Sequence, residues 1–324
     1  MKAFILKKIF ELIPTFFGIT IIIFLVIHLA PGNPIDSMGT FNPNISAESL
    51  ENMKRLYHLN EPLYVQYLEW LKSLFRLDFG TSMVDGVGVM HKIAERLPVT
   101  IGINVVVLLI SLAISIPIGI ISAIRKDSFI DKFFTFFVFS GYAMPSFWLA
   151  LLLMILFSVR LHMLPLSGLH SLNIKPGTPT YYLDLVKHLI IPVSIGVYGS
   201  LAGFSRYIRK GIIDVLDKDF IRMLYLRGVS KKRIYIHTLK NAMLPLVTIL
   251  GLSIPGLIGG SVIMESIFAI PGMGQLFYFS AMSRDYPTIM GILTISTILT
   301  LVGNLIADIT YALVDPRIRY SDNG

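Results

Sequence analysis

The stretch VTIGINVVVLLISLAISIPIGIISAI, residues 99–124, contains no charged side chain. A helix that crosses a lipid bilayer needs roughly 20 consecutive, mostly apolar residues, and this stretch is long enough. Five other stretches have the same character, so the sequence predicts an all-α integral membrane protein with about six transmembrane helices. The predicted spans are residues 9–30, 99–124, 133–159, 188–204, 244–264 and 288–314.

The composition excludes most soluble classes. Of the 324 residues, 54% are hydrophobic and 15% are charged, whereas a soluble domain usually carries about 25% charged residues. The net charge of +8 raises the question of nucleic-acid binding, but a mean hydropathy of +0.71 argues against a soluble nucleic-acid binder. The absence of cysteine excludes a disulfide framework and cysteine-based metal sites.

Two other membrane-related interpretations fit poorly. A β-barrel would show ten-residue segments of alternating hydrophobicity, and the sequence has none. The first span follows several lysines, as in a signal peptide, but its apolar run is longer and ends without a small-x-small cleavage site. We therefore expect residues 1–30 to be an uncleaved N-terminal anchor, residues 31–98 an extracytoplasmic segment, and residues 99–324 a core with the other five spans.

The distribution of Lys and Arg predicts the orientation, because short cytoplasmic loops are enriched in these residues. With the N-terminus inside, the inner segments contain 18 of the 28 basic residues. Six more lie in the 31–98 segment, and loops longer than about 60 residues are largely exempt from this rule. Both termini are therefore expected in the cytoplasm.

The loop of residues 205–243, between the fourth and fifth spans, carries nearly all of the net charge. It has ten Lys and Arg against three Asp, a net of +7. Apolar Ile213, Leu216, Phe220 and Leu224 recur at helical spacing. Gly228 suits a helix C-terminus, and Ser230 is placed to cap a second helix that begins at Lys231. The loop thus predicts two short amphipathic helices around a glycine turn. Its charge alone is also compatible with a surface lying against anionic lipid.

Several motifs, in order along nearly the whole chain, resemble the permease subunits of ABC importers, in the dipeptide, oligopeptide and nickel branch and of the B type. The basic loop resembles the cytoplasmic "EAA" loop of that family. The matching segments are APGNP (30–34), LNEPL (59–63), QY (66–67), WL (70–71), DFGTS (78–82), ERLP (95–98), PSFW (145–148), DFIR (219–222), RGVS (227–230), KNAMLP (240–245), ESIF (265–268), PGMG (271–274), RDYP (284–287) and DPRIRY (315–320). This chain departs from the family at Asn33, where Asp is usual, and at residues 223–226, MLYL, where small residues are common.

The resemblance implies half of a translocation pathway in a prokaryotic cytoplasmic membrane, working by alternating access on short peptides. It further implies a second, different permease subunit, two cytoplasmic ATPase subunits and an extracytoplasmic solute-binding protein. Related systems import nickel chelates or oligosaccharides, and a secondary transporter or channel is the alternative from another class. No cofactor is expected in this chain, and ATP and Mg²⁺ are expected in the partner ATPases. The residues expected to contact an ATPase are Asp219, Phe220, Arg222, Leu224, Arg227, Gly228, Ser230, Lys231, Lys232 and Arg233.

The residues themselves support a non-enzymatic role. The chain has no G-x-x-x-x-G-K-[ST] loop for ATP and no H-E-x-x-H or G-x-S-x-G motif. Of the few polar residues at membrane depth, we expect Asp308 to form a structural ion pair or to reach the interface, and His28 to be a satisfied interfacial histidine. Pro117, Pro145, Pro192 and Pro255 lie within or near spans, where proline bends a helix; they are candidate hinges, with a fixed helix shape as the alternative.

Overall fold

The computed structural model describes residues 2–29, 47–56, 60–172, 174–242, 253, 255–257 and 259–314. In that part of the chain every regular element is a helix, and β-type pairing is limited to one isolated bridge between Thr81 and Gly88. The prediction of an all-α membrane protein is confirmed.

Four described helices are long and apolar enough to cross a membrane, as segments of α1 (Lys2–Leu29), α5 (Val89–Ile124), α8 (Pro179–Leu216) and α14 (Tyr286–Val314). They correspond to the first, second, fourth and sixth predicted spans. The segment of residues 31–98 contains the helices α3 (Ala47–Leu56) and α4 (Leu63–Phe75).

The third predicted span, residues 133–159, is not one straight helix. It consists of α6 (Phe129–Ala143), α7 (Ser146–Leu153) and the π-helical turn η1 (Met154–Arg160), and the two arms are bent by 96°. The break lies at Met144 and Pro145. Met144 has an extended backbone, with ψ of 131°, because the ring of the following proline disfavours the α conformation.

The fifth predicted span, residues 244–264, lies mostly outside the described residues. Its described part contains a 3₁₀ turn, η2 (Pro255–Leu257), and the first residues of the short helix α12 (Val262–Ile267). Helix α13 (Met273–Met282) follows and precedes α14.

Helix α8 is much longer than the predicted fourth span, residues 188–204. Thr178 caps its N-terminus by accepting a hydrogen bond from the Tyr181 amide, and Pro179 occupies the first turn. Buried Ile208, Ile212 and Val215 continue the helical spacing beyond residue 204. The segment expected to begin a loop at residue 205 is therefore helical as far as Leu216.

The largest helix pair in the core is α5 against α8. Their close approach depends on Gly119, where an added Cβ would lie 2.8 Å from the Ile208 side chain and 2.9 Å from the Ser205 carbonyl oxygen. Small residues let membrane helices pack closely in this way.

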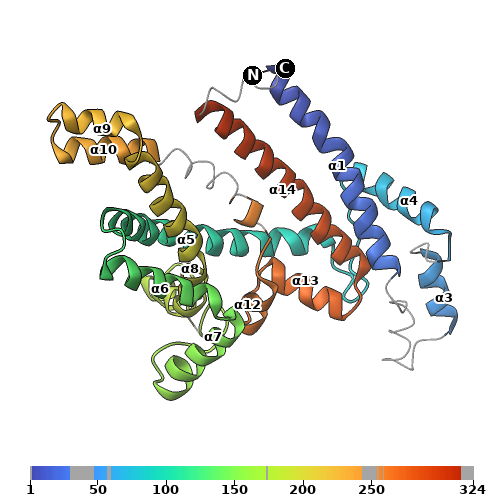
Figure 1. The fold of residues 1–324 in the computed structure, drawn as a ribbon. Coiled ribbons are helices and arrows are strands. Elements are labelled where there is room, and N and C mark those ends of the chain that lie inside the picture. The colour runs from blue at the N-terminus through green and yellow to red at the C-terminus, as the bar shows by residue number, and fades with distance from the viewer. Residues whose placement is uncertain are drawn as a thin grey trace.

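A second group forms around α1 and α14, which run side by side with α4 against α1, whereas α12 and α13 lie between the two groups (Figure 1). The hydroxyls of Thr20 and Tyr67 are 3.1 Å apart and join α1 to α4. At the other end of α1, Lys8 Nζ lies 3.1 Å from Asp308 Oδ2 of α14. Asp308 thus forms the structural ion pair expected for it.

Candidate functional site

The basic loop folds into a helical hairpin, formed by α9 (Asp219–Leu226) and α10 (Lys231–Ala242). Gly228 between them has a positive φ of 70°, the conformation for which glycine was expected at a helix C-terminus. The Ser230 carbonyl accepts the Ile234 amide at 3.1 Å, which places Ser230 at the start of α10. The two predicted helices and their glycine turn are confirmed.

The apolar side of this hairpin is anchored on α8. Ile221 of α9 and Ile234 of α10 are completely buried, in a cluster with Ile208, Ile212 and Val215 of α8. Such burial contributes roughly 1.5–3 kcal/mol for each large aliphatic side chain. The hairpin is therefore a firmly attached extension of α8.

One detail of the predicted pattern is wrong. Ile213, Leu216, Phe220 and Leu224 all pack against that cluster, but they do not belong to a single helix. Helix α8 ends at Leu216 and α9 begins at Asp219. The amide of Asp217 bonds back to Ile213, whereas the carbonyl of Lys218 accepts the amides of Ile221 and Arg222 and starts the new helix.

The opposite side of the hairpin is exposed and mixes apolar with charged residues. The exposed fractions are 87% for Leu226, 57% for Ile236 and 53% for Met223. The side chain of Arg222 is 70% exposed and forms an ion pair with Asp219 at 3.6 Å. The remaining exposed candidates are Arg227, Gly228, Ser230 and Arg233. Phe220 and Leu224 instead pack inward, and the side chains of Lys231 and Lys232 lie outside the described set.

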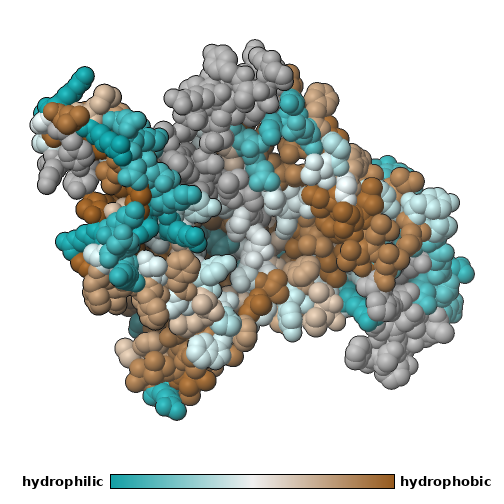
Figure 2. Space-filling view, viewed as in Figure 1, coloured by the Kyte–Doolittle hydropathy of each residue, from teal (hydrophilic) through white to brown (hydrophobic). Residues whose placement is uncertain are grey.

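The hairpin projects from one end of the molecule, the end at which α1 begins and α14 finishes (Figure 1). Hydrophilic residues gather over this projection, whereas hydrophobic residues cover much of the surface at α1 and α7 (Figure 2). A projecting, rigidly held surface with exposed apolar side chains among arginines is suited to docking a protein partner.

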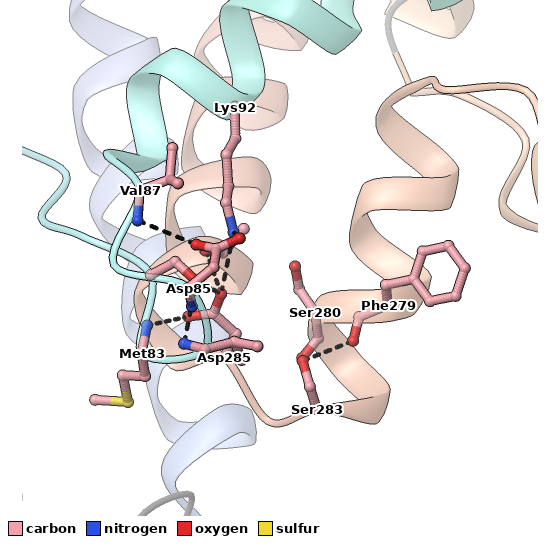
Figure 3. Close-up of polar contacts among 11 residues, drawn as sticks. Met83, Asp85, Val87, Lys92, Phe279, Ser280, Ser283 and Asp285 are labelled. Atoms are coloured by element: carbon pink, nitrogen blue, oxygen red, sulfur yellow. Dashed lines mark hydrogen bonds and ion pairs between the residues drawn. The ribbon is translucent and has the colours of Figure 1, made fainter.

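A second organised site joins the DFGTS segment to the start of α14. Asp285 is 1% exposed and accepts hydrogen bonds from Ser82 Oγ at 2.5 Å, the Met83 amide at 3.0 Å and Thr288 Oγ1 at 2.6 Å. Lys92 of α5 points at Asp285 and Asp85, at 3.9 Å and 2.7 Å (Figure 3). The site thus joins the DFGTS loop and the adjoining start of α5 to the start of α14, which is far away in the sequence.

The groups around Asp85 at this site lower the pKa of its carboxyl group. Burial raises its pKa, but the hydrogen bonds from the Lys92 ammonium and the Val87 amide outweigh this effect, so the pKa lies below the ordinary value of 3.8. The carboxylate of Asp85 is thereby kept charged opposite Lys92.

A third site joins the ESIF segment to the PGMG segment and to α5. Glu265 is 6% exposed, and its Oε2 accepts the amides of Gly274 at 2.7 Å and Gln275 at 3.0 Å, in the first turn of α13. Its Oε1 accepts Thr100 Oγ1 of α5 at 2.9 Å, and the same hydroxyl oxygen accepts the Met273 amide. A carboxylate at a helix N-terminus is favoured by the unpaired amides and the helix dipole. Glu265 therefore fixes α13 to α5.

Sequence reasoning did not identify Asp285 or Glu265 as organising residues, although both lie in motifs that carried the resemblance. In the described part of the chain, no three His, Asp or Glu side chains are placed to hold a metal ion.

The candidate hinges differ in their settings. Pro145 lies at the 96° bend, whereas Pro117 and Pro192 lie inside α5 and α8, which continue through them. Pro255 begins the 3₁₀ turn η2. Nearby, Asn104 of α5 donates to the Leu257 carbonyl at 2.9 Å.

His28 is a satisfied histidine, as predicted, with its hydrogen-bonding and stacking partner inside α1. Its Nδ1 lies 2.9 Å from the Phe24 carbonyl, and its ring stacks on the Phe24 ring at 3.8 Å between centroids.

Comparison with known proteins agrees with these features. Residues 115–320 match the family described as the binding-protein-dependent transport system inner membrane component, and residues 1–104 match the N-terminal segment of such membrane components. The chain is similar to the oligopeptide transport system permease protein AppB of Bacillus subtilis, at 45% identity over 322 residues covering 99% of this chain and 100% of the relative.

Two further relatives cover the same extent. The di/tripeptide transport system permease protein DppB of Pseudomonas aeruginosa is 34% identical over 339 residues, covering 99% of each chain. The oligopeptide transport system permease protein OppB of Haemophilus influenzae is 36% identical over 322 residues, covering 99% of this chain and 100% of the relative.

Proposed function

Because the chain belongs to the family of binding-protein-dependent transport system inner membrane components, we propose that its α9–α10 hairpin is the surface through which a cytoplasmic ATPase drives transport. The chain is a multi-pass inner membrane protein and the permease subunit of an ABC importer for peptides. We propose that it forms half of the pathway, with a second and different permease subunit, and moves short peptides by alternating access.

The observation that carries the proposal is the attachment of the hairpin to α8. Ile221 and Ile234 are fully buried against the end of this helix. A displacement of the hairpin is therefore expected to move α8 with it. Of all the helices that contact α8, α5 packs against it most extensively. Closure of an ATPase pair beneath the hairpin would thus tilt two helices that cross the membrane.

ATP and Mg²⁺ are assigned to the partner subunits, because this chain lacks the G-x-x-x-x-G-K-[ST] loop. Delivery of the peptide is assigned to an extracytoplasmic binding protein. The relatives named for oligopeptides and for di/tripeptides support short peptides as cargo ahead of nickel chelates or oligosaccharides.

We assign the hairpin end of the molecule to the cytoplasm, with both termini. The ion pair between Lys8 and Asp308 supports the second assignment, because it brings the beginning of α1 and the end of α14 to the same side. The hairpin extends from that side (Figure 1), and the Lys and Arg distribution favours the cytoplasm for it.

The test uses two leucines of equal character. Leu226 on the hairpin is 87% exposed and Leu172, in the loop before α8, is 92% exposed, so neither Leu→Glu change disturbs the core. In the reconstituted transporter, Leu226→Glu is expected to reduce ATP-dependent peptide uptake at least tenfold and to weaken ATPase retention. Leu172→Glu is expected to retain ATPase binding.

Equal ATPase retention and uptake in both variants would overturn the docking assignment. Transport by this chain alone, without an ATPase, would instead favour a secondary transporter or channel.

A further inference from the structure

A pocket of about 250 Å³ opens between α5, α6 and α8, away from the hairpin surface. Its apolar walls come from all three helices. Polar groups also reach it, above all Arg206 and Arg209 of α8 and Thr135 of α6. The full lining is Ile118, Ser122, Phe134, Thr135, Val138, Phe139, Ala202, Ser205, Arg206 and Arg209.

The two arginines are in different electrostatic states. Arg209 donates two hydrogen bonds to Asp131, from Nε to Oδ1 at 2.9 Å and from a terminal nitrogen to Oδ2 at 2.7 Å. This bidentate geometry with a buried carboxylate neutralises its charge. Arg206 is exposed, and no carboxylate among the described residues lies within ion-pair distance of it. The pocket therefore carries one unbalanced positive charge.

The surroundings of Arg206 are apolar. Its guanidinium lies 5.8 Å from the centre of the Phe139 ring, over the ring face. Next to the pocket, α6 exposes a series of aromatic side chains, with exposed fractions of 54% for Phe133, 75% for Phe136 and 73% for Tyr142. Such a surface is typical of contact with lipid. An ionisable side chain in a membrane-spanning helix indicates a functional group by default.

The Arg209–Asp131 pair indicates where the pocket lies along the helices. Asp131 lies in the first turn of α6, and Arg209 lies in the last third of α8, toward the hairpin. With the orientation proposed above, on which this inference rests, the pocket lies at the cytoplasmic leaflet. Bacterial membranes carry anionic lipid there, and basic pockets between membrane helices are suited to its headgroups.

We propose that this pocket binds the phosphate group of an anionic phospholipid from the cytoplasmic leaflet. The Arg206 fork matches the geometry of phosphate oxygens, and the exposed Thr135 hydroxyl can donate one further hydrogen bond. The apolar walls receive the first carbons of the acyl chains, which a free phosphate ion lacks. The bound lipid joins α6 to α8 at the base of the bent third span.

The test compares thermal stability in nanodiscs and requires no transport activity, so it is independent of whether the hairpin docks an ATPase. The complex is placed in phosphatidylethanolamine alone or with added phosphatidylglycerol. We expect the anionic lipid to raise the melting temperature by about 3–5 °C, because a ligand that binds only the folded state stabilises it. Arg206→Gln is expected to abolish the rise.

Lys210→Gln is the matched control. Lys210 is exposed one helical turn beyond Arg206 and does not line the pocket, so its variant loses the same charge but is expected to keep most of the rise. If both variants lose the rise in melting temperature equally, the rise comes from general attraction between anionic lipid and a basic surface, and the proposal is overturned. Arg206→Lys, which keeps the charge without the fork, is expected to give an intermediate rise and serves if the Gln variant cannot be purified.

Two further measurements identify the ligand. Native mass spectrometry is expected to find one phosphatidylglycerol retained by the wild-type chain and none by Arg206→Gln. Inorganic phosphate, added to the phosphatidylethanolamine nanodiscs at matched ionic strength, is expected to give no rise. An Arg206-dependent rise with inorganic phosphate alone, or no response to phosphatidylglycerol, would overturn a lipid site.

Discussion

Ser82 and Asp285 are 203 positions apart in the chain, yet Ser82 Oγ donates a 2.5 Å hydrogen bond to Asp285 Oδ2. This bond fixes the loop that precedes α5 to the residue that immediately precedes α14. Bringing two positions so far apart in the chain together costs conformational entropy, and the buried hydrogen bonds at Asp285 help to offset that cost. The joint therefore has consequences for stability that can be measured.

Replacing Asp285 is expected to destabilise the protein strongly. Asp285→Asn leaves buried donors at Ser82 and Met83 with a poorer acceptor and leaves Lys92 one carboxylate short, at a cost of about 2–3 kcal/mol. Asp85→Asn is the control, because the Asp85 side chain is 47% exposed and exposed ion pairs contribute little. Thermal unfolding of the purified complex compares the two, and equal shifts would contradict the central role of Asp285.

The pair of Asp85 with Lys92 makes a local contact pH-dependent. Because the pKa of Asp85 is lowered on folding, its stabilising effect is fully present above the unfolded value of about 3.8 and disappears as the pH falls through the lower, folded value. Hydrogen exchange of the Met83–Val87 loop, measured from pH 6 down to pH 2.5 with correction for intrinsic rates, should show this loss. Asp85→Asn should remove that component, and an unchanged profile would contradict it.

A side chain at Gly228 is expected to strain the hairpin. Gly228→Val forces a β-branched residue to a φ of 70°, at a cost of about 1–3 kcal/mol, and should loosen α9 from α10 and lower ATPase coupling. Gly228→Asn should recover much of the activity, because Asn tolerates this conformation. Gly177→Val is the matched control at a φ of 78° in the loop before α8. Equal loss of coupling in both valine variants would remove the special role of the hairpin.

The contact between α5 and α8 can be tested at two glycines of α5. Gly119→Ala places a methyl group against Ile208 and the Ser205 carbonyl, and such overpacking costs about 1–3 kcal/mol. Gly102→Ala meets no atom within 4 Å in this chain and is expected to be neutral or slightly stabilising. Melting temperatures of the two purified variants check this difference, which should be several degrees.

Pro145 allows a direct test of a candidate hinge. Pro145→Ala restores a backbone amide at the 96° bend and relieves the restriction on Met144. If bending there accompanies transport, uptake should fall at least threefold with little change in melting temperature. Pro192→Ala, inside the continuous helix α8, is the comparison. Unchanged uptake in Pro145→Ala would identify the bend as fixed shape.

The sequence predicted features whose cause is local. Span positions followed from runs of apolar residues, and the hairpin followed from helical spacing around Gly228. It did not predict the sharp bend at Pro145, because a proline at membrane depth is compatible with both a mild kink and a break. The end of α8 was placed too early, at residue 204, because the charges at Arg206 and Arg209 resemble a loop when the buried Ile208 between them and Ile212 after them are not weighed.

The joints at Asp285 and Glu265 could not be predicted from local patterns. The residues around Glu265 on α12 do not indicate its role. That role depends on its hydrogen bonds with amides at the start of α13 and with Thr100, 165 positions away. Only the packing of separate segments brings these groups together. A single acidic residue in a sequence does not reveal whether it faces water or a helix N-terminus.

Helix α8 extends without interruption from Pro179 to Leu216, about 57 Å at 1.5 Å per residue, which is well over the roughly 30 Å of the hydrocarbon core. A rod of that length amplifies rotation: a tilt of about 5° moves one end by about 5 Å relative to the other. Near the end of α8 opposite the hairpin, Asp184 accepts two hydrogen bonds from Ser171, at 2.7 and 2.8 Å. With the proposed orientation, a distance probe attached beside Ser171 should therefore report movements of the hairpin from the opposite side of the membrane.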